Sequence, residues 1–240
     1  VEFHSKWPAQ GYEGTPIPYS QWLTEVPLLD HTSQYEGTTY RDWVAGIRQG
    51  AINAGYPDLI VANNEYGIGS YDDYTGFGTR YKRSMVQVDL LQELIIAGCD
   101  MTAMWDNRCS GDYNSLLANN YQLNPMHYAF ELLTAAQGAT MIELSTNYTY
   151  VYGFAAKTWT ALQVYLMNKT ESDQPISISF TGFQPNAGQT PDGDSLVDTA
   201  DHWGQLQALT VSGSGPFTAT LPALSYNRIV FARAKTDTTP

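Results

Sequence analysis

The chain has 240 residues, which is enough for one large or two modest domains with a sizeable core. Its 24 acidic residues outnumber its 12 basic residues, and the formal net charge of -12 opposes binding to nucleic acid phosphates and anionic lipid surfaces. No apolar run approaches the roughly 20 residues that a bilayer-spanning helix needs. We therefore expect neither nucleic acid nor a membrane as a partner.

The first residues, Val1 to His4, already lie in a predicted strand, with no initiator Met and no signal peptide before them. We expect a mature or cleaved product, or a piece of a longer polypeptide. A long polar loop rich in Pro and Gly is predicted from Trp7 to Thr38.

The next hundred or so positions alternate between strand and helix patterns. Apolar residues recur at helical spacing over 40–51 and 86–97, and each stretch is followed by a glycine that can end a helix, Gly55 and Gly98. Short apolar runs at 59–65 and 101–105 predict buried strands. Asn124 and Pro125 predict the start of another helix, ending near Gly138. Three strand–helix units in a row predict a parallel sheet.

After Gly138 the pattern becomes one of short β-rich runs separated by turn residues. These runs predict an antiparallel β-sandwich of the jelly-roll kind, and they lie at 141–144, 150–156, 162–167, 176–180, 206–211 and 229–232. We therefore predict an α/β domain over 1–138 and an all-β sandwich domain over 139–240. Three strand–helix units cannot close a (β/α)8 barrel. The start within a strand favours a partial barrel whose remainder lies upstream of Val1.

The two cysteines, Cys99 and Cys109, are predicted to be unpaired. A strand of ten residues between them would span roughly 33 Å. A disulfide tolerates only about 7 Å between Cα atoms.

Polar and aromatic residues gather where the three predicted strands end. They are His4, Lys6 and Trp7 at the first exit, Asn63, Asn64, Glu65 and Tyr66 at the second, and Trp105, Asp106, Asn107 and Arg108 at the third. In a parallel barrel these exits converge on one face, where the catalytic residues lie. A Trp can stack on the apolar face of a sugar while Asn, His and Arg bind its hydroxyl groups. Glycosidic bonds are usually cut by two carboxylates, so Glu65 is a candidate catalytic residue.

Plainer interpretations remain open for the same residues. Glu65 could make only a surface hydrogen bond, His4 could be structural, and Trp7 could merely cover the barrel mouth. Arg108 could pair with Asp106 or Asp112. Asp192 and Asp194, followed by Asp198 and Asp201, could offer oxygen ligands to calcium, but a solvated loop is the favoured interpretation and no metal site is predicted.

The order of these motifs resembles the second half of clan A glycoside hydrolases. The matching residues are His4-Ser5-Lys6-Trp7-Pro8, then Asn63-Asn64-Glu65-Tyr66-Gly67, then Met104-Trp105-Asp106-Asn107, all followed by a β-sandwich. The resemblance implies barrel strands 6–8, with Glu65 as the nucleophile that ends strand 7, Trp105 as the sugar platform from strand 8, and His4 at the exit of strand 6. Lys6 departs from the clan, whose common His-x-Tyr pattern has a tyrosine there.

Asn64-Glu65 also resembles the Asn-Glu of strand 4, where the clan has its proton donor. A strand 4 glutamate would require four more strand–helix units, on the order of a hundred residues or more, before the sandwich. Only one further strand fits before Gly138. Strand 7 is therefore favoured, and the proton donor is expected outside this chain.

Within the clan, the Tyr/Asn/Gly-rich loops and the Trp-Asp-Asn-Arg exit most resemble family-86 agarases and porphyranases. The resemblance implies a retaining hydrolase of β-linked polysaccharide, with an agarose- or porphyran-type galactan as substrate, no cofactor, and a secreted, extracellular or periplasmic location. It also implies that the N-terminal half of the same enzyme is a partner. Family-39 and family-51 xylosidases and arabinofuranosidases share this layout. A non-catalytic carbohydrate-binding protein and a structural fragment remain alternatives.

Overall fold

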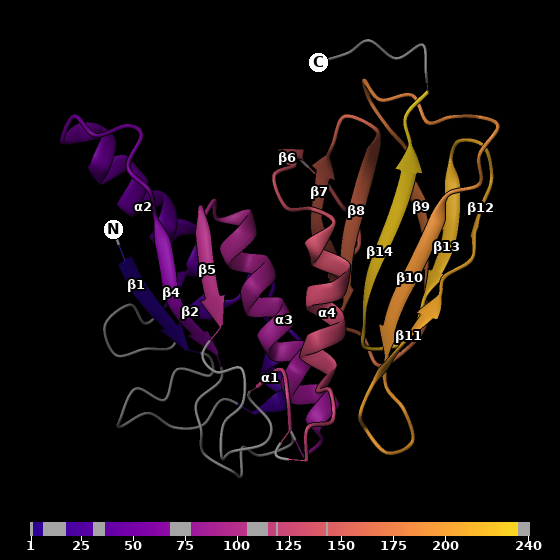
Figure 1. Ribbon diagram of the computed structural model, residues 1–240, viewed down its shortest axis with the longest axis horizontal. Coiled ribbons are helices and arrows are strands. Elements are labelled where there is room, and N and C mark those ends of the chain that lie inside the picture. The colour runs from indigo at the N-terminus through magenta and orange to yellow at the C-terminus, as the bar shows by residue number, and fades with distance from the viewer. Residues whose placement is uncertain are drawn as a thin grey trace. The chain divides into compact units, whose positions relative to one another are not determined.

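The computed structural model describes residues 2–6, 18–30, 37–67, 78–104, 115–118, 120–142 and 144–234. The chain divides into two compact units, Val1–His127 and Tyr128–Pro240, with helix α4 (Pro125–Thr134) running across the division (Figure 1). The predicted domain boundary at 138 stays a prediction. None of the described helices is both long and apolar enough to cross a membrane.

The first unit is built on a parallel sheet of three strands, in the order β1 (Glu2–Lys6), β4 (Ala62–Gly67) and β5 (Met101–Met104). Helix α2 (Tyr40–Asn53) precedes β4, and α3 (Arg80–Ile96) connects β4 to β5 (Figure 1). The predicted parallel sheet is confirmed. Within the described residues the sheet is open, and the assignment of this unit to part of a (β/α)8 barrel stays a prediction.

The segment predicted as one loop from Trp7 to Thr38 contains three short elements, so that prediction is wrong in part. They are helix α1 (Tyr19–Trp22) and the antiparallel strands β2 (Leu29–Asp30) and β3 (Thr38–Thr39). Packing explains α1: Trp22 is fully buried, and its indole Nε1 donates to the buried carboxylate of Asp89 on α3 at 2.8 Å. A four-residue helix of this kind has no periodicity that a sequence could reveal.

Threonine caps define where the two long helices begin. The hydroxyl of Thr39 accepts from the backbone N–H of Asp42 at α2, and that of Thr79 accepts from Lys82 at α3. The cap at Thr79 starts α3 six residues before the apolar stripe that predicted it. Gly55 and Gly98 follow the helices with φ of 86° and 84°, a left-handed conformation that suits glycine, as predicted.

The second unit consists of two antiparallel sheets (Figure 1). The larger has the order β11 (Gln205–Ala208), β10 (Asp192–Val197), β14 (Ser225–Ala232), β8 (Ala161–Asn168), β7 (Val151–Lys157) and β6 (Thr140–Ile142). The smaller has the order β12 (Val211–Ser212), β13 (Phe217–Leu221) and β9 (Gln174–Ile178). One core cluster takes side chains from both sheets, including Val164, Ile176, Phe217 and Phe231. The jelly-roll sandwich itself stays a prediction.

Two predictions for this unit are corrected. Asp192 and Asp194 lie in strand β10, not in a solvated loop, and the carboxylate of Asp194 accepts from Arg228 Nη2 on β14 at 2.5 Å. The run 206–211, predicted as one strand, is divided between β11 and β12, which belong to different sheets. Strand β13 was missed, although its residues alternate between buried and exposed.

Cys99 is a free thiol, as predicted, and Cys109 lies outside the described residues. Burial raises the pKa of the Cys99 thiol from 9.0 to about 12, while Arg48 lowers it and Asp100 raises it. A raised folded-state pKa contributes stability that is present below 9.0 and is lost as pH rises toward the folded-state value.

We therefore expect the alkylation rate of Cys99 by iodoacetamide to keep rising with pH beyond 9.0, where an ordinary thiol would level off. Mass spectrometry of a Cys109→Ser variant isolates this thiol. The same variant unfolded in urea is the control and should level off near 9.0. A folded protein that levels off at the same pH would contradict the burial effect.

Candidate active site

Strand β4 carries the candidate carboxylate, and the parallel ladder places it beside β1. Phe3 pairs with Asn63, whereas the next residue, His4, pairs with Glu65. The backbones of two predicted site residues are therefore direct neighbours on adjacent parallel strands. At the same end, Lys6 pairs with Gly67.

A β-bulge lies at this point of β4. Along β1 the pairing moves on by one residue while β4 moves on by two, from Asn63 to Glu65. The other neighbour agrees, because Asn63 pairs with Thr102 and Tyr66 with Met104. β4 thus has one residue more than each flanking strand between Asn63 and Tyr66. A bulge re-aims side chains and is often found next to an active site.

The residues around the bulge differ sharply in exposure. Asn64 is exposed, Asn63 is 1% exposed and Tyr66 is fully buried. Burial raises the pKa of the Tyr66 phenol well above its ordinary value. Tyr66 therefore stays a neutral phenol at physiological pH, and its packing holds the strand beside Glu65 in place. The predicted contacts of Asn63, Asn64 and Tyr66 with a substrate stay predictions.

The remaining predicted site residues are placed only in part. The structure describes the backbone of His4, Lys6 and Glu65, and their side chains lie outside the description. Trp7, Trp105, Asn107 and Arg108 lie outside the described residues altogether. Met104 pairs with Tyr66, so the third predicted exit begins next to β4.

The opposite end of β4 is fixed by contacts that the sequence did not predict. Val61 N–H donates to Asp100 Oδ2 at 2.8 Å, and Asp100 N–H donates to the Val61 carbonyl at 2.9 Å. Arg48 of α2 donates to the same Asp100 carboxylate at 2.8 Å and to the Gly98 carbonyl at 3.0 Å. These contacts fix the entry of β4 against that of β5. No local pattern marks Arg48, because its partners lie about fifty positions away.

Helices α2 and α3 are joined by a charged pair. Arg41 donates through Nε and Nη2 to the two carboxylate oxygens of Glu93, at 2.5 and 2.8 Å. Glu93 is fully buried, and a two-point contact of this kind orients both side chains. The pair holds together the two helices that flank β4 in the sequence.

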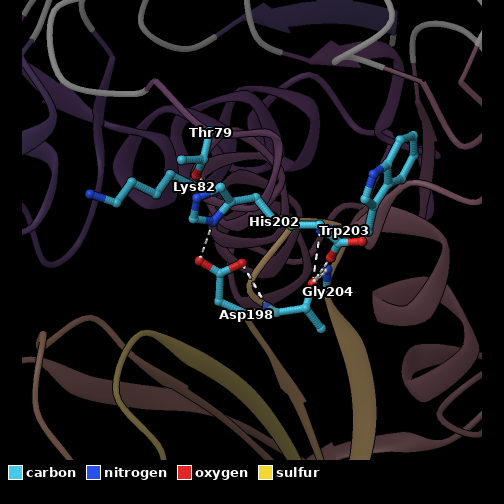
Figure 2. A network of polar contacts seen from close by, with 8 residues as sticks. Thr79, Lys82, Asp198, His202, Trp203 and Gly204 are labelled. Atoms are coloured by element: carbon cyan, nitrogen blue, oxygen red, sulfur yellow. Dashed lines mark hydrogen bonds and ion pairs between the residues drawn. The ribbon is translucent and has the colours of Figure 1, made fainter.

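Asp198 and Asp201, the other acidic residues considered from the sequence, stabilise a turn in the second unit. Figure 2 shows the His202 ring directed toward Asp198, with 2.9 Å between Nδ1 and Oδ2. Thr199 Oγ1 accepts from the backbone N–H groups of Trp203 and Gly204 and donates to Asp201 at 2.7 Å. The hydrogen bond from Thr199 lowers the pKa of Asp201. Among the described residues, no group of three or more His, Cys, Asp or Glu is arranged to hold a metal ion.

No protein-family model matches the chain, and no curated protein matches it by sequence. Solved structures do match. CelM2, a bifunctional glucanase-xylanase from a metagenome library, has a TM-score of 0.65 and 19% identity over 97% of this chain and 43% of its own. A family-44 endoglucanase from Clostridium acetobutylium has a TM-score of 0.61 and 16% identity over 97% of this chain and 46% of its own. A family-30 endoxylanase from Clostridium papyrosolvens has a TM-score of 0.60 and 14% identity over 82% of this chain and 47% of its own.

The chain has a glycoside hydrolase fold. It spans less than half the length of each of these three proteins. Because identity is below 20% in each case, the match establishes the fold alone. The glycoside hydrolase fold agrees with the coarse resemblance predicted from the motifs, whereas the family-86 agarase placement stays a prediction.

Proposed function

We propose that the chain is part of a retaining glycoside hydrolase that acts on β-linked polysaccharide, with Glu65 as its nucleophile. The observation that carries the proposal is the place of Glu65. It lies at a bulge in the central strand of a parallel sheet, in register with His4 on the neighbouring strand, within a glycoside hydrolase fold.

In the proposed reaction Glu65 attacks the anomeric carbon and forms a glycosyl ester as the glycosidic C–O bond breaks. The leaving oxygen takes a proton from a second carboxyl group, supplied by the N-terminal half of the same enzyme. Water then hydrolyses the ester, giving its proton to that carboxylate, and Glu65 is released. Every step uses carboxyl groups and water, so the mechanism needs no cofactor.

For the substrate we propose a sugar chain that stacks on Trp105. His4, Lys6, Trp7, Asn107 and Arg108 would bind its hydroxyl groups or cover its rings. Xylan and β-glucan are candidates because glucanase and xylanase activities are named for CelM2, a protein of similar fold. An agarose- or porphyran-type galactan, favoured by the motifs, and the substrates of xylosidases and arabinofuranosidases are the others. A secreted, extracellular or periplasmic location would suit any of these polymers.

The substrate is tested with the intact protein, meaning this chain together with the N-terminal half that supplies the proton donor. It is incubated with xylan, β-glucan, agarose, porphyran and arabinan, and new reducing ends are measured. Release from one of the β-linked polymers is the expected result. Binding to a polymer without any release would favour a non-catalytic carbohydrate-binding protein.

Replacing Trp105 with Ala in the intact protein should weaken substrate binding and lower turnover while the protein still folds. A platform residue contributes stacking to the sugar and little to the core. Steady-state kinetics and thermal unfolding measure the two effects separately. Trp105→Phe is the matched control and should retain part of the binding. If Trp105→Ala fails to fold, Trp105 belongs to the core.

A further inference from the structure

The turn between β7 and β8 presents a tryptophan to solvent. Trp159 is 84% exposed, more than any other large hydrophobic side chain in the described part of the chain. An exposed indole is a large apolar surface left in contact with water. Trp159 and Thr160 are the two residues of the turn between Thr158 and Ala161.

The turn itself is held firmly. Thr158 N–H donates to the Ala161 carbonyl at 2.9 Å, and Ala161 N–H donates to the Thr158 hydroxyl at 3.1 Å. Arg233 N–H donates to the Thr160 carbonyl at 2.8 Å, which ties the turn to the end of β14. The Trp159 backbone is therefore fixed before any ligand arrives, and binding need not order it.

One cationic side chain lies beside the indole and a second lines the same groove. The Arg233 guanidinium carbon is 5.5 Å from the centroid of the Trp159 ring, within the range of a cation–π contact. Lys157 comes from the last position of β7 and lines the same groove. The groove has a volume of about 440 Å³, and its polar lining includes Gln137, Thr140 and Thr158.

Charge and shape together define the ligand class. Of the described residues that line the groove, Lys157 and Arg233 are charged and none is acidic, in a chain whose net charge is -12. An aromatic ring suits the apolar face of a sugar, hydroxyl and amide groups suit its hydroxyls, and the two cations suit a carboxylate or sulfate.

We propose that this groove, formed by Trp159, Lys157, Arg233 and their neighbours in the second unit, binds an anionic polysaccharide chain. Trp159 stacks on a sugar ring, while Lys157 and Arg233 contact its carboxylate or sulfate groups. The proposal concerns binding and does not depend on the hydrolase activity proposed above.

Affinity electrophoresis of the intact protein tests whether the groove binds an anionic polysaccharide. The protein carries Glu65→Gln so that the polymers stay uncut. Carboxymethyl cellulose and hydroxyethyl cellulose share a backbone and differ in charge, and so do the sulfated galactan carrageenan and its chemically desulfated form. Comparing the two charged polymers separates carboxylate from sulfate as the preferred group. Tyr150→Ala is the matched control, because Tyr150 is another exposed aromatic residue of the same unit and does not line the groove.

We expect Trp159→Ala to weaken binding to at least one charged polymer about tenfold, and Trp159→Phe to weaken it less. Lys157→Gln should weaken binding to that polymer about threefold, and added salt should reduce this difference. Tyr150→Ala should bind as the parent does.

Three results would overturn the proposal. The parent could fail to be retarded by either charged polymer, or Trp159→Ala could be retarded as strongly as the parent. The parent could also bind each neutral polymer as tightly as its charged counterpart, which would reject an anionic ligand. Thermal unfolding of each variant checks that the second unit remains folded. A failed hydrolase proposal would show as absent turnover in the polymer screen and would leave these retardation differences unchanged.

Discussion

Glu65→Gln in the intact protein should lower hydrolysis of the substrate by at least about a thousandfold, because an amide cannot form the glycosyl ester. Asn64→Ala is the matched control, since Asn64 is exposed next to Glu65 on the same bulge and cannot act as the nucleophile. It should reduce activity far less. Full activity in Glu65→Gln would reject Glu65 as the nucleophile.

A small external nucleophile distinguishes the two roles a glutamate can have here. With an activated substrate, azide should partly restore turnover by Glu65→Ala and give a product of inverted configuration, because azide then replaces the missing nucleophile directly. If Glu65 were the proton donor, azide would attack the glycosyl ester instead and the product would have retained configuration. The configuration of the azide product, measured by NMR, thus tests the placement of β4 as strand 7.

Gly153→Ala should strongly destabilise the second unit. Gly153 lies in β7 opposite Leu166 of β8, and a Cβ atom there would lie 1.8 Å from the Tyr165 carbonyl oxygen. The obstacle is backbone in a central strand pair, so β7 and β8 would have to separate. We expect a loss of at least about 3 kcal/mol in the free energy of unfolding.

Gly46→Ala supplies the matched control for this loss. Gly46 is exposed within α2, and a Cβ atom there would meet nothing within 4 Å. The same substitution should therefore stabilise the first unit by about 0.5–1 kcal/mol, because alanine favours a helix. Urea denaturation measures both variants. Similar free energies of unfolding for the two would contradict the predicted clash at Gly153.

Long periodic segments were predictable from the sequence. The helices near 40–53 and 80–96 have apolar stripes and glycine stops. The apolar residues 59–61 that predicted β4 lie just before it, and the prediction that β5 is buried is wrong, because Met101 and Ala103 are exposed. Most strands of the second unit were also predicted, because the side chains that they contribute to its core cluster are apolar. The order of the strand-end motifs then pointed to the fold that the solved structures share.

Features that depend on distant partners were not predictable. Asp194 resembles a loop residue until Arg228 of β14 is placed beside it. The bulge in β4 appears only when the register with both neighbouring strands is known. The role of Arg48 likewise depends on the residues before β4 and β5, which meet only in the folded protein. Trp159 is part of no periodic pattern in the sequence, so its exposure becomes evident only in the hairpin turn.

The position of β14 has a consequence for synthesis of the protein on the ribosome. β14 is the final strand of the second unit in the sequence, yet it lies between β8 and β10 inside the six-stranded sheet. Until residue 232 has left the exit tunnel, β6–β8 and β10–β11 can form only as two separate pieces with unpaired edges. Such edges are prone to pair with other nascent chains, so this unit should depend on chaperones until β14 has left the tunnel.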